Sequence, residues 1–297
     1  MKIDGVFSGG GVKAYAFIGA LQQIEHAGLS FERVAGTSAG AIIASLLAAG
    51  YDHQEIEILL DELDLKKLLD PPALTKMFPF TKWLFLYFQL GIHKGNQLEK
   101  WIYRKLATKG IYTFKDIDPS YLKVVASDIS LGKLVVIPDD LERIYGINSA
   151  YFSVAKAVRM SAGFPYFFMP KKMISKNRKK SFIVDGGLLS NFPLWVFEDR
   201  HGRKKRPILG VKLSTSAIDK LEPRKISNAI DMLHALFATM KEAHDARYIS
   251  KSQSNNIIFI PVESVTSTNF YISEQVKDSL IHEGYESAKA FLPHWPK

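Results

Sequence analysis

The chain contains no cysteine among its 297 residues. This absence excludes disulfide bonds, thiolate nucleophiles and cysteine-ligated metal sites, so any chemistry must use hydroxyls, carboxylates, imidazoles or amines. Long hydrophobic runs are also missing, since the longest, Trp83 to Ile92, has about half the length of a membrane-spanning helix and includes Gln89. A strand-like segment containing Asp4 occupies the place where a signal peptide would have its apolar run. We therefore expect a cytoplasmic protein.

Proline is scarce as well, with 13 residues, and no proline- or serine-rich linker interrupts the chain. Hydrophobic residues make up 47% and charged residues 23% of the sequence. This composition is typical of a globular domain and unlike that of disordered or fibrous chains. The length and the missing linker predict one domain over residues 1–297.

Apolar strand-like segments alternate with helical patterns, which predicts an α/β fold. Strands are expected at Ile3–Phe7, Phe31–Ala35, Tyr121–Ala126, Leu134–Ile137, Phe182–Val184, Ile208–Leu213 and Ile257–Ile260. Helices are expected over residues 13–27, 39–49, 53–69, 96–107, 153–160, 226–248 and 273–291. Between about 52 and 110, two helical patterns follow each other without a strand, so we interpret this stretch as a helical insertion that caps the sheet.

The motif Gly36-Thr37-Ser38-Ala39-Gly40 lies between a predicted strand and a helix of small residues. A serine on a sharp strand-to-helix turn exposes its hydroxyl, and flanking glycines provide the room and the dihedral angles that such a turn needs. The N-terminal end of the following helix would point at a developing oxyanion. Ser38 is therefore the candidate nucleophile.

A glycine-rich loop with the sequence SGGGVK follows the first predicted strand and opens the next helix. Its backbone N–H groups can converge on an anion, and such a nest can serve as an oxyanion hole. Gly9, Gly11 and Ala14 also fit the glycine pattern of a dinucleotide-binding loop. Glu32, however, lies near the start of the second strand, whereas the ribose-binding acid belongs at its end, and this disfavours nucleotide binding.

Asp185, followed by Gly186 and Gly187, ends a short apolar strand. Taken alone, Asp-Gly is most often a turn. A serine hydroxyl needs a positioned base to remove its proton, and an aspartate can be that base when partial desolvation raises its pKa. Asp185 is therefore the candidate general base.

A histidine base is the competing arrangement, in the chain order serine, acid, histidine. The histidines that follow Asp185 are His201, His234, His244, His282 and His294. Two lie within a helical pattern and one lies in a basic run, and none is clearly at the end of a strand. The sequence favours surface or helix-face positions for all five and leaves the triad as an alternative.

With the triple glycine, the serine motif and Asp-Gly-Gly in this order, the sequence resembles the patatin-like phospholipase family. The blocks Arg159–Pro165 and Asn191–Pro193 are also similar to family segments on either side of the catalytic aspartate. The resemblance implies a three-layer α/β/α sandwich with a mostly parallel central sheet. It also implies a dyad of Ser38 and Asp185.

The resemblance assigns further roles position by position. The backbone of Gly9, Gly10 and Gly11 would form the oxyanion hole, and Gly36, Gly40, Gly186, Gly187 and Lys13 would complete the motifs. Lys13 matches a position where the family has arginine or lysine, whereas Ala14 replaces a usual glycine. No metal ion and no cofactor is implied.

The implied reaction is hydrolysis of an acyl lipid through an acyl-enzyme intermediate, as in a phospholipase A. A catalytically silent lipid- or nucleotide-binding module remains the alternative from another class. An aromatic segment could line an acyl channel, touch a bilayer or be buried against the sheet; its residues are Phe78, Phe80, Trp83, Phe85, Tyr87 and Phe88.

The formal charge of +9 is confined to two short runs, Lys171–Lys180 and Arg200–Arg206, and the rest of the chain is slightly acidic. We therefore expect no nucleic-acid partner. Peripheral membrane contact, solvated loops and contact with an acidic partner all remain open interpretations of these runs. If the first run is the tip of a hairpin, it lies about 15 Å from Asp185, and the second run enters its strand at the end opposite the site.

Overall fold

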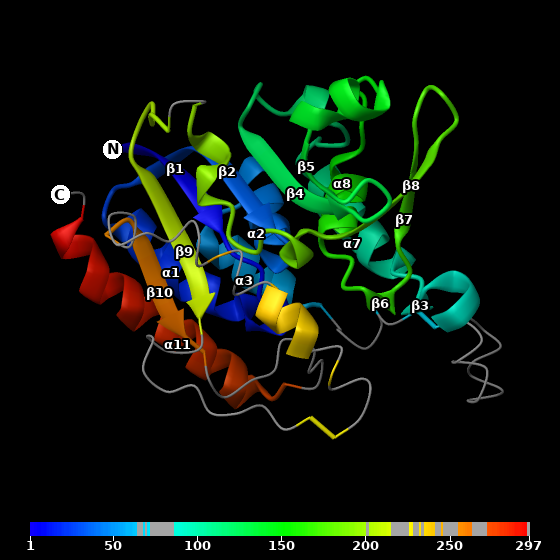
Figure 1. Ribbon diagram of the computed structural model, residues 1–297. Helices are drawn as coiled ribbons and strands as arrows, with labels where there is room; N and C mark the ends of the chain where they lie inside the picture. The colour runs from blue at the N-terminus through cyan, green and yellow to red at the C-terminus, as the bar shows by residue number, and fades with distance from the viewer. Residues whose placement is uncertain are drawn as a thin grey trace.

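The computed structural model describes residues 1–63, 68, 70–71, 86–199, 202–214, 226–227, 232, 235–240, 245, 255–262 and 272–295. Its strands are β1 (Lys2–Phe7), β2 (Ser30–Thr37), β3 (Gly91–His93), β4 (Leu122–Asp128), β5 (Lys133–Ile137), β6 (Tyr166–Phe168), β7 (Lys171–Ile174), β8 (Lys180–Asp185), β9 (Ile208–Ser214) and β10 (Ile257–Pro261). Its α-helices include α1 (Tyr15–His26), α2 (Ala39–Ala48), α3 (His53–Asp61), α7 (Asn96–Ala107), α8 (Val154–Ser161) and α11 (Glu274–Phe291). Figure 1 shows this arrangement.

The central sheet has the strand order β10-β9-β1-β2-β4-β8-β7, and β5 pairs with β4. The strands from β10 to β4 are parallel, whereas β5, β7 and β8 join through antiparallel pairs. The two remaining strands, β3 and β6, form a separate parallel pair. The predicted α/β fold with a mostly parallel central sheet flanked by helices is thus confirmed.

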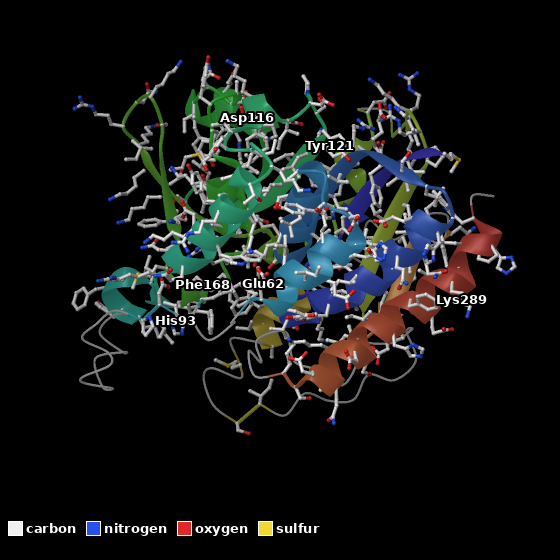
Figure 2. The ribbon with its side chains drawn as sticks, turned by 180° about the vertical axis from the view of Figure 1, so that it is seen from behind. Glu62, His93, Asp116, Tyr121, Phe168 and Lys289 are labelled. Atoms are coloured by element: carbon white, nitrogen blue, oxygen red, sulfur yellow. The ribbon has the colours of Figure 1, made fainter. Side chains whose placement is uncertain are left out.

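Successive side chains of each strand point to opposite faces of the sheet, so they belong to two separate hydrophobic cores. On β2, for example, Val34 belongs to the larger core and Ala35 to the smaller one. Helices α1, α2 and α11 pack in the larger core. In Figure 2, which views the molecule from behind, α1 (blue) and α11 (red) lie in front of the sheet. On the other face, the segment around Phe192 and Phe197 covers the smaller core, and Asp245 accepts a hydrogen bond from the Phe192 N–H.

Strands β2 and β8 run toward each other along one edge of β4. Strand β5 pairs with Val124–Asp128 of β4, so it overlaps the pairing of both β2 and β8 and must lie on the opposite edge. The last residue of β2, Thr37, pairs with Val125, and the last residue of β8, Asp185, pairs with Ala126. Two strand ends therefore meet beside consecutive residues of β4.

All seven predicted strands are present, and so is the conditional hairpin of β7 and β8. The prediction of no strand between 52 and 110 is wrong, because β3 pairs with the distant β6. A three-residue strand without an alternating pattern gives no periodic signal. Helix α3 also ends earlier than predicted, at Asp61. The predicted helix at 226–248 falls largely outside the described residues.

No helix in the described ranges combines the length and the apolar character needed to cross a bilayer. This result agrees with the absence of a long hydrophobic run in the sequence.

Candidate active site

Ser38 occupies a sharp turn between β2 and α2. Its φ of 55° and ψ of −122° lie in a region that residues with a side chain rarely adopt. Ser38 donates its backbone N–H to Ser161 Oγ at 2.9 Å, which fixes the turn from the side of α8. The turn leaves the Ser38 hydroxyl able to reach Asp185, on another strand.

Asp185 lies at the end of β8 and is 5% exposed. Ser38 Oγ donates a hydrogen bond to Asp185 Oδ2 at 2.7 Å, and the other carboxylate oxygen accepts the Gly187 N–H at 2.8 Å. Because Gly187 holds one oxygen, the second is oriented toward the serine. The structure thus brings together the two residues that the sequence singled out, although they are 147 positions apart.

The end of α8 supports both partners. Ser161 Oγ accepts the Ser38 N–H and donates to Val125 O at 2.6 Å, and Gly163 O accepts the Asp185 N–H at 3.0 Å. Ser161 is completely buried. Ser161 belongs to the block Arg159–Pro165, which is similar to a family segment but carries no local signal of this supporting role.

The glycine loop after β1 lies against this turn. A Cβ added at Gly9 would come 3.2 Å from Ser38 Cβ, so the loop backbone runs directly beside the serine. The Gly9 N–H donates to Asn191 O at 2.9 Å. The N–H groups of Gly10 and Gly11 have no acceptor among the described residues. Of the three glycines, these two can therefore offer donors to an oxygen near Ser38.

Two side chains hold the loop in place. Asn191 is buried and donates through its side-chain Nδ2 to Gly9 O at 3.4 Å. Its backbone carbonyl oxygen also accepts the Gly9 N–H. Lys13, also buried, donates through Nζ to Val262 O at 2.8 Å. Lys13 thus ties the loop to the chain after β10. Asn191 belongs to the second block that is similar to a family segment, Asn191–Pro193, and its supporting role has no local sequence signal either.

The motif glycines occupy points of close backbone contact. A Cβ at Gly40 would overlap the carbonyl oxygens of Phe7 and Ser8, and one at Gly186 would overlap Val125 O. Gly36 lies against Gly40, and Gly187 lies beside Asp185. A larger residue at these positions would push β1, α2 and β8 apart, so the glycines set the distance across the site.

Arg159 is a buried cation next to these supports. Its Nε donates to Gly95 O at 2.9 Å, and its Nη2 donates to Lys94 O and Met169 O at 3.0 and 3.1 Å. Burial lowers the pKa of Arg159 to about 10, and Glu99, Asp70 and Asp185 oppose this shift. The guanidinium therefore joins the β3 and β6 loops to the helix that carries Ser161.

The histidines of the described residues lie elsewhere. His53 pairs with Glu25, His93 packs beside Phe167, and His26, His282 and His294 are exposed. None of these five hydrogen-bonds Ser38 Oγ. The other triad candidates, His201, His234 and His244, lie outside the described residues, as do Phe78, Phe80, Trp83 and Phe85 of the aromatic segment.

Solved structures with the same fold include two bacterial proteins. VipD from Legionella pneumophila aligns with a TM-score of 0.57 at 19% identity, over 98% of this chain and 66% of VipD. The type III effector ExoU of Pseudomonas aeruginosa aligns with a TM-score of 0.51 at 19% identity, over 99% of this chain and 54% of ExoU. The chain therefore spans just under two thirds of VipD and about half of ExoU.

Sequence comparison finds similar proteins as well. The uncharacterized protein YqhO of Bacillus subtilis is 46% identical over 99% of both chains. A cUMP-AMP-activated phospholipase of Escherichia coli is 26% identical over 62% of this chain and 54% of its own length. The family model for patatin-like phospholipases matches residues 5–198, which include the glycine loop, the serine turn and Asp185. The chain belongs to the patatin-like phospholipase family.

Proposed function

We propose that this protein is a serine acyl-ester hydrolase that cleaves acyl lipids with a dyad of Ser38 and Asp185. The observation that carries the proposal is the 2.7 Å hydrogen bond between Ser38 Oγ and Asp185 Oδ2 at the meeting point of two strand ends. A serine held against an oriented carboxylate has its proton acceptor in place before substrate arrives.

In the first half-reaction, Ser38 Oγ attacks the ester carbonyl carbon while its proton passes to Asp185. Negative charge develops on the carbonyl oxygen, where the N–H groups of Gly10 and Gly11 and the N-terminal end of α2 stabilise it. The carbon–oxygen bond to the alcohol then breaks, and Asp185 returns the proton to the leaving oxygen. An acyl group remains on Ser38.

In the second half-reaction, water attacks the acyl carbon and gives a proton to Asp185. The bond to Ser38 Oγ breaks, the serine regains its proton, and the fatty acid leaves. One carboxylate serves both halves, so the scheme needs no histidine. Membership in a phospholipase family, and the phospholipase activity named for the E. coli relative, support a lipid ester as the substrate.

The test is hydrolysis of a short-chain chromogenic ester in the presence of a chelator. Ser38→Ala and Asp185→Asn should each lower kcat by about 10³-fold or more while circular dichroism stays unchanged. Ser45→Ala and Asp118→Asn are matched controls that should retain activity, because Ser45 bonds its own helix and Asp118 is exposed.

Three outcomes would contradict the proposal. Full activity of Ser38→Ala would show that the nucleophile lies elsewhere. An equally large loss in a folded variant of His201, His234 or His244 would favour the triad. A wild-type protein that neither hydrolyses lipid nor reacts with a fluorophosphonate would be a silent binding module.

A further inference from the structure

Large apolar side chains are exposed along the edge of the molecule that carries the dyad. Tyr87 and Phe88, in a helical turn at residues 86–89, are 78% and 72% exposed, and Tyr166 is 43% exposed. Three further residues recur every four positions and are each about half exposed. We call this set the apolar rim: Tyr87, Phe88, Tyr166, Met232, Leu236 and Met240.

Strand pairing, a ring contact and a backbone hydrogen bond connect the rim to the dyad. Gly91, just after the turn at 86–89, pairs with Tyr166 in the register of β3 and β6. Phe164 stacks near Phe237 of the helical segment 235–240, with ring centroids 5.7 Å apart. Gly163, which precedes Phe164, accepts the Asp185 N–H through its backbone oxygen. In Figure 1 the turn, β3–β6 and segment 235–240 lie along one edge, and Figure 2, which labels His93 and Phe168 there, agrees.

Backbone strain occurs at Tyr166 of the rim and at Leu90, which follows the turn at 86–89. Leu90 and Tyr166 have φ values of 60° and 62°, in a region that bulky residues avoid. Both side chains are exposed apolar groups, at 38% and 43%. Positions of this kind persist where the surrounding structure enforces them, and they cluster at functional sites. The strained backbone of Leu90 and Tyr166 carries apolar side chains that remain partly exposed, so packing within the described residues does not repay the cost of the strain.

The charges beside the rim favour an anionic partner. Lys94 and Lys100 are exposed and form no ion pair within the described part of the chain. The neighbouring acids are already engaged: Glu99 pairs with Lys171, and Asp70 accepts the N–H groups of residues 95–97. Aromatic and aliphatic side chains flanked by lysines are typical of surfaces that settle in a lipid interface.

We propose that the apolar rim docks on a lipid surface with anionic head groups. This inference rests on the proposed function, because an acyl-lipid substrate is what the rim would meet. Docking through the rim would bring the edge that carries the dyad against the lipid surface. Ser38 would then receive its ester from the lipid surface and not from bulk water. Without a partner, the apolar side chains of the rim would remain exposed to water, which costs free energy.

The hairpin tip at 175–179 and the loop before β9 lie at the opposite end of the sheet and serve as an internal control. The hairpin tip at 175–179 is separated from Asp185 by the length of β8, roughly 15 Å or more at about 3.3 Å per residue. Arg206 leads into β9, which pairs with the start of β1, whereas the glycine loop follows its end. Figure 1 shows both loops on the side away from the rim.

The experiment measures binding without turnover. Ser38→Ala protein is mixed with vesicles of equal parts phosphatidylcholine and phosphatidylglycerol, and the bound fraction is measured by flotation. In this background, Tyr87→Ser with Phe88→Ser, and Leu236→Ser with Met240→Ser, remove the two sides of the rim. Tyr151→Ser with Ile174→Ser is the matched control, because these side chains are 67% and 59% exposed away from the rim.

Each rim pair should lower the vesicle partition coefficient at least about tenfold, since each of these exposed side chains contributes apolar area on the order of 100 Å². The control pair should stay within about twofold, in the range of ordinary surface substitutions. Lys94→Gln with Lys100→Gln should abolish the preference for phosphatidylglycerol and weaken the salt dependence. Circular dichroism of every variant should match the parent.

Equal binding of the rim variants and the parent would overturn the inference, as would absence of binding by the parent. Loss of binding on neutralising Lys176, Arg178, Lys179 and Lys180 instead would place docking on the hairpin. A dimer that dissociates in the rim variants, with vesicle binding unchanged, would identify a second copy as the occupant. Because Ser38→Ala cannot turn over, these results are independent of the esterase assay, which tests the proposed function separately.

Discussion

The backbone at Ser38 predicts an unusual order of stability between two substitutions. Ser38→Ala and Ser38→Gly both remove the hydroxyl that bonds Asp185, so the loss of that hydrogen bond is common to them. They differ in the Cβ, which sits at φ 55° and ψ −122°. Strain of a side-chain-bearing residue in such a region is about 1–3 kcal/mol.

Glycine relieves this strain but adds about 0.5–1 kcal/mol of conformational entropy to the unfolded chain. The difference leaves Ser38→Gly more stable than Ser38→Ala by about 1 kcal/mol. At Ala41, inside α2, the same Ala-to-Gly change should destabilise by about 1 kcal/mol or more. The sign of the effect is therefore opposite at two positions three residues apart.

The assay is unfolding in urea, with the free energy of unfolding obtained from midpoint and slope. Equal slopes for the two Ser38 variants would show that the comparison reports stability alone. If Ser38→Ala were the more stable variant by about 0.5 kcal/mol or more, the strained turn would be refuted, and so would its role in projecting the hydroxyl.

Three other substitutions test the supports of the site. Ser161→Ala leaves the Ser38 N–H and Val125 O without their partner and should lower the free energy of unfolding by about 1–3 kcal/mol in urea titrations. Asn191→Ala removes the side-chain hydrogen bond to Gly9 O and keeps the backbone bond from the Gly9 N–H, so the glycine loop is held less firmly and steady-state kinetics should show a fall in kcat larger than any change in KM. Gly186→Ala forces a Cβ onto Val125 O and should lower the melting temperature in calorimetry, with activity lost.

Local signals in the sequence predicted seven of the strands and most helices, and they singled out the two residues of the proposed dyad. Ser38 and Asp185 each lie at the end of an apolar strand, where side chains of a sheet become accessible, and this position can be read without a structure. Short strands were missed because β3 and β6 gain their stability from each other, across a long sequence separation, and show no alternation.

The residues that support the candidate site were harder to predict than Ser38 and Asp185 themselves. Ser161 and Arg159 form hydrogen bonds with backbone atoms of segments far away in the sequence. A serine or arginine within a helical pattern does not indicate which distant backbone atoms it will bond. The meeting of β2 and β8 along one edge of β4 depends on strand order, which the sequence does not specify. The loop at Gly9 shows the same limit, because its N–H is taken by Asn191, far along the chain.

The most direct test of the dyad is the site of fluorophosphonate labelling, read by peptide mass mapping of the intact protein. We expect a single adduct on the peptide that contains Ser38, with labelling much slower in Asp185→Asn because the serine then lacks its base. Labelling at another residue, or an equal labelling rate in Asp185→Asn, would contradict the proposed dyad.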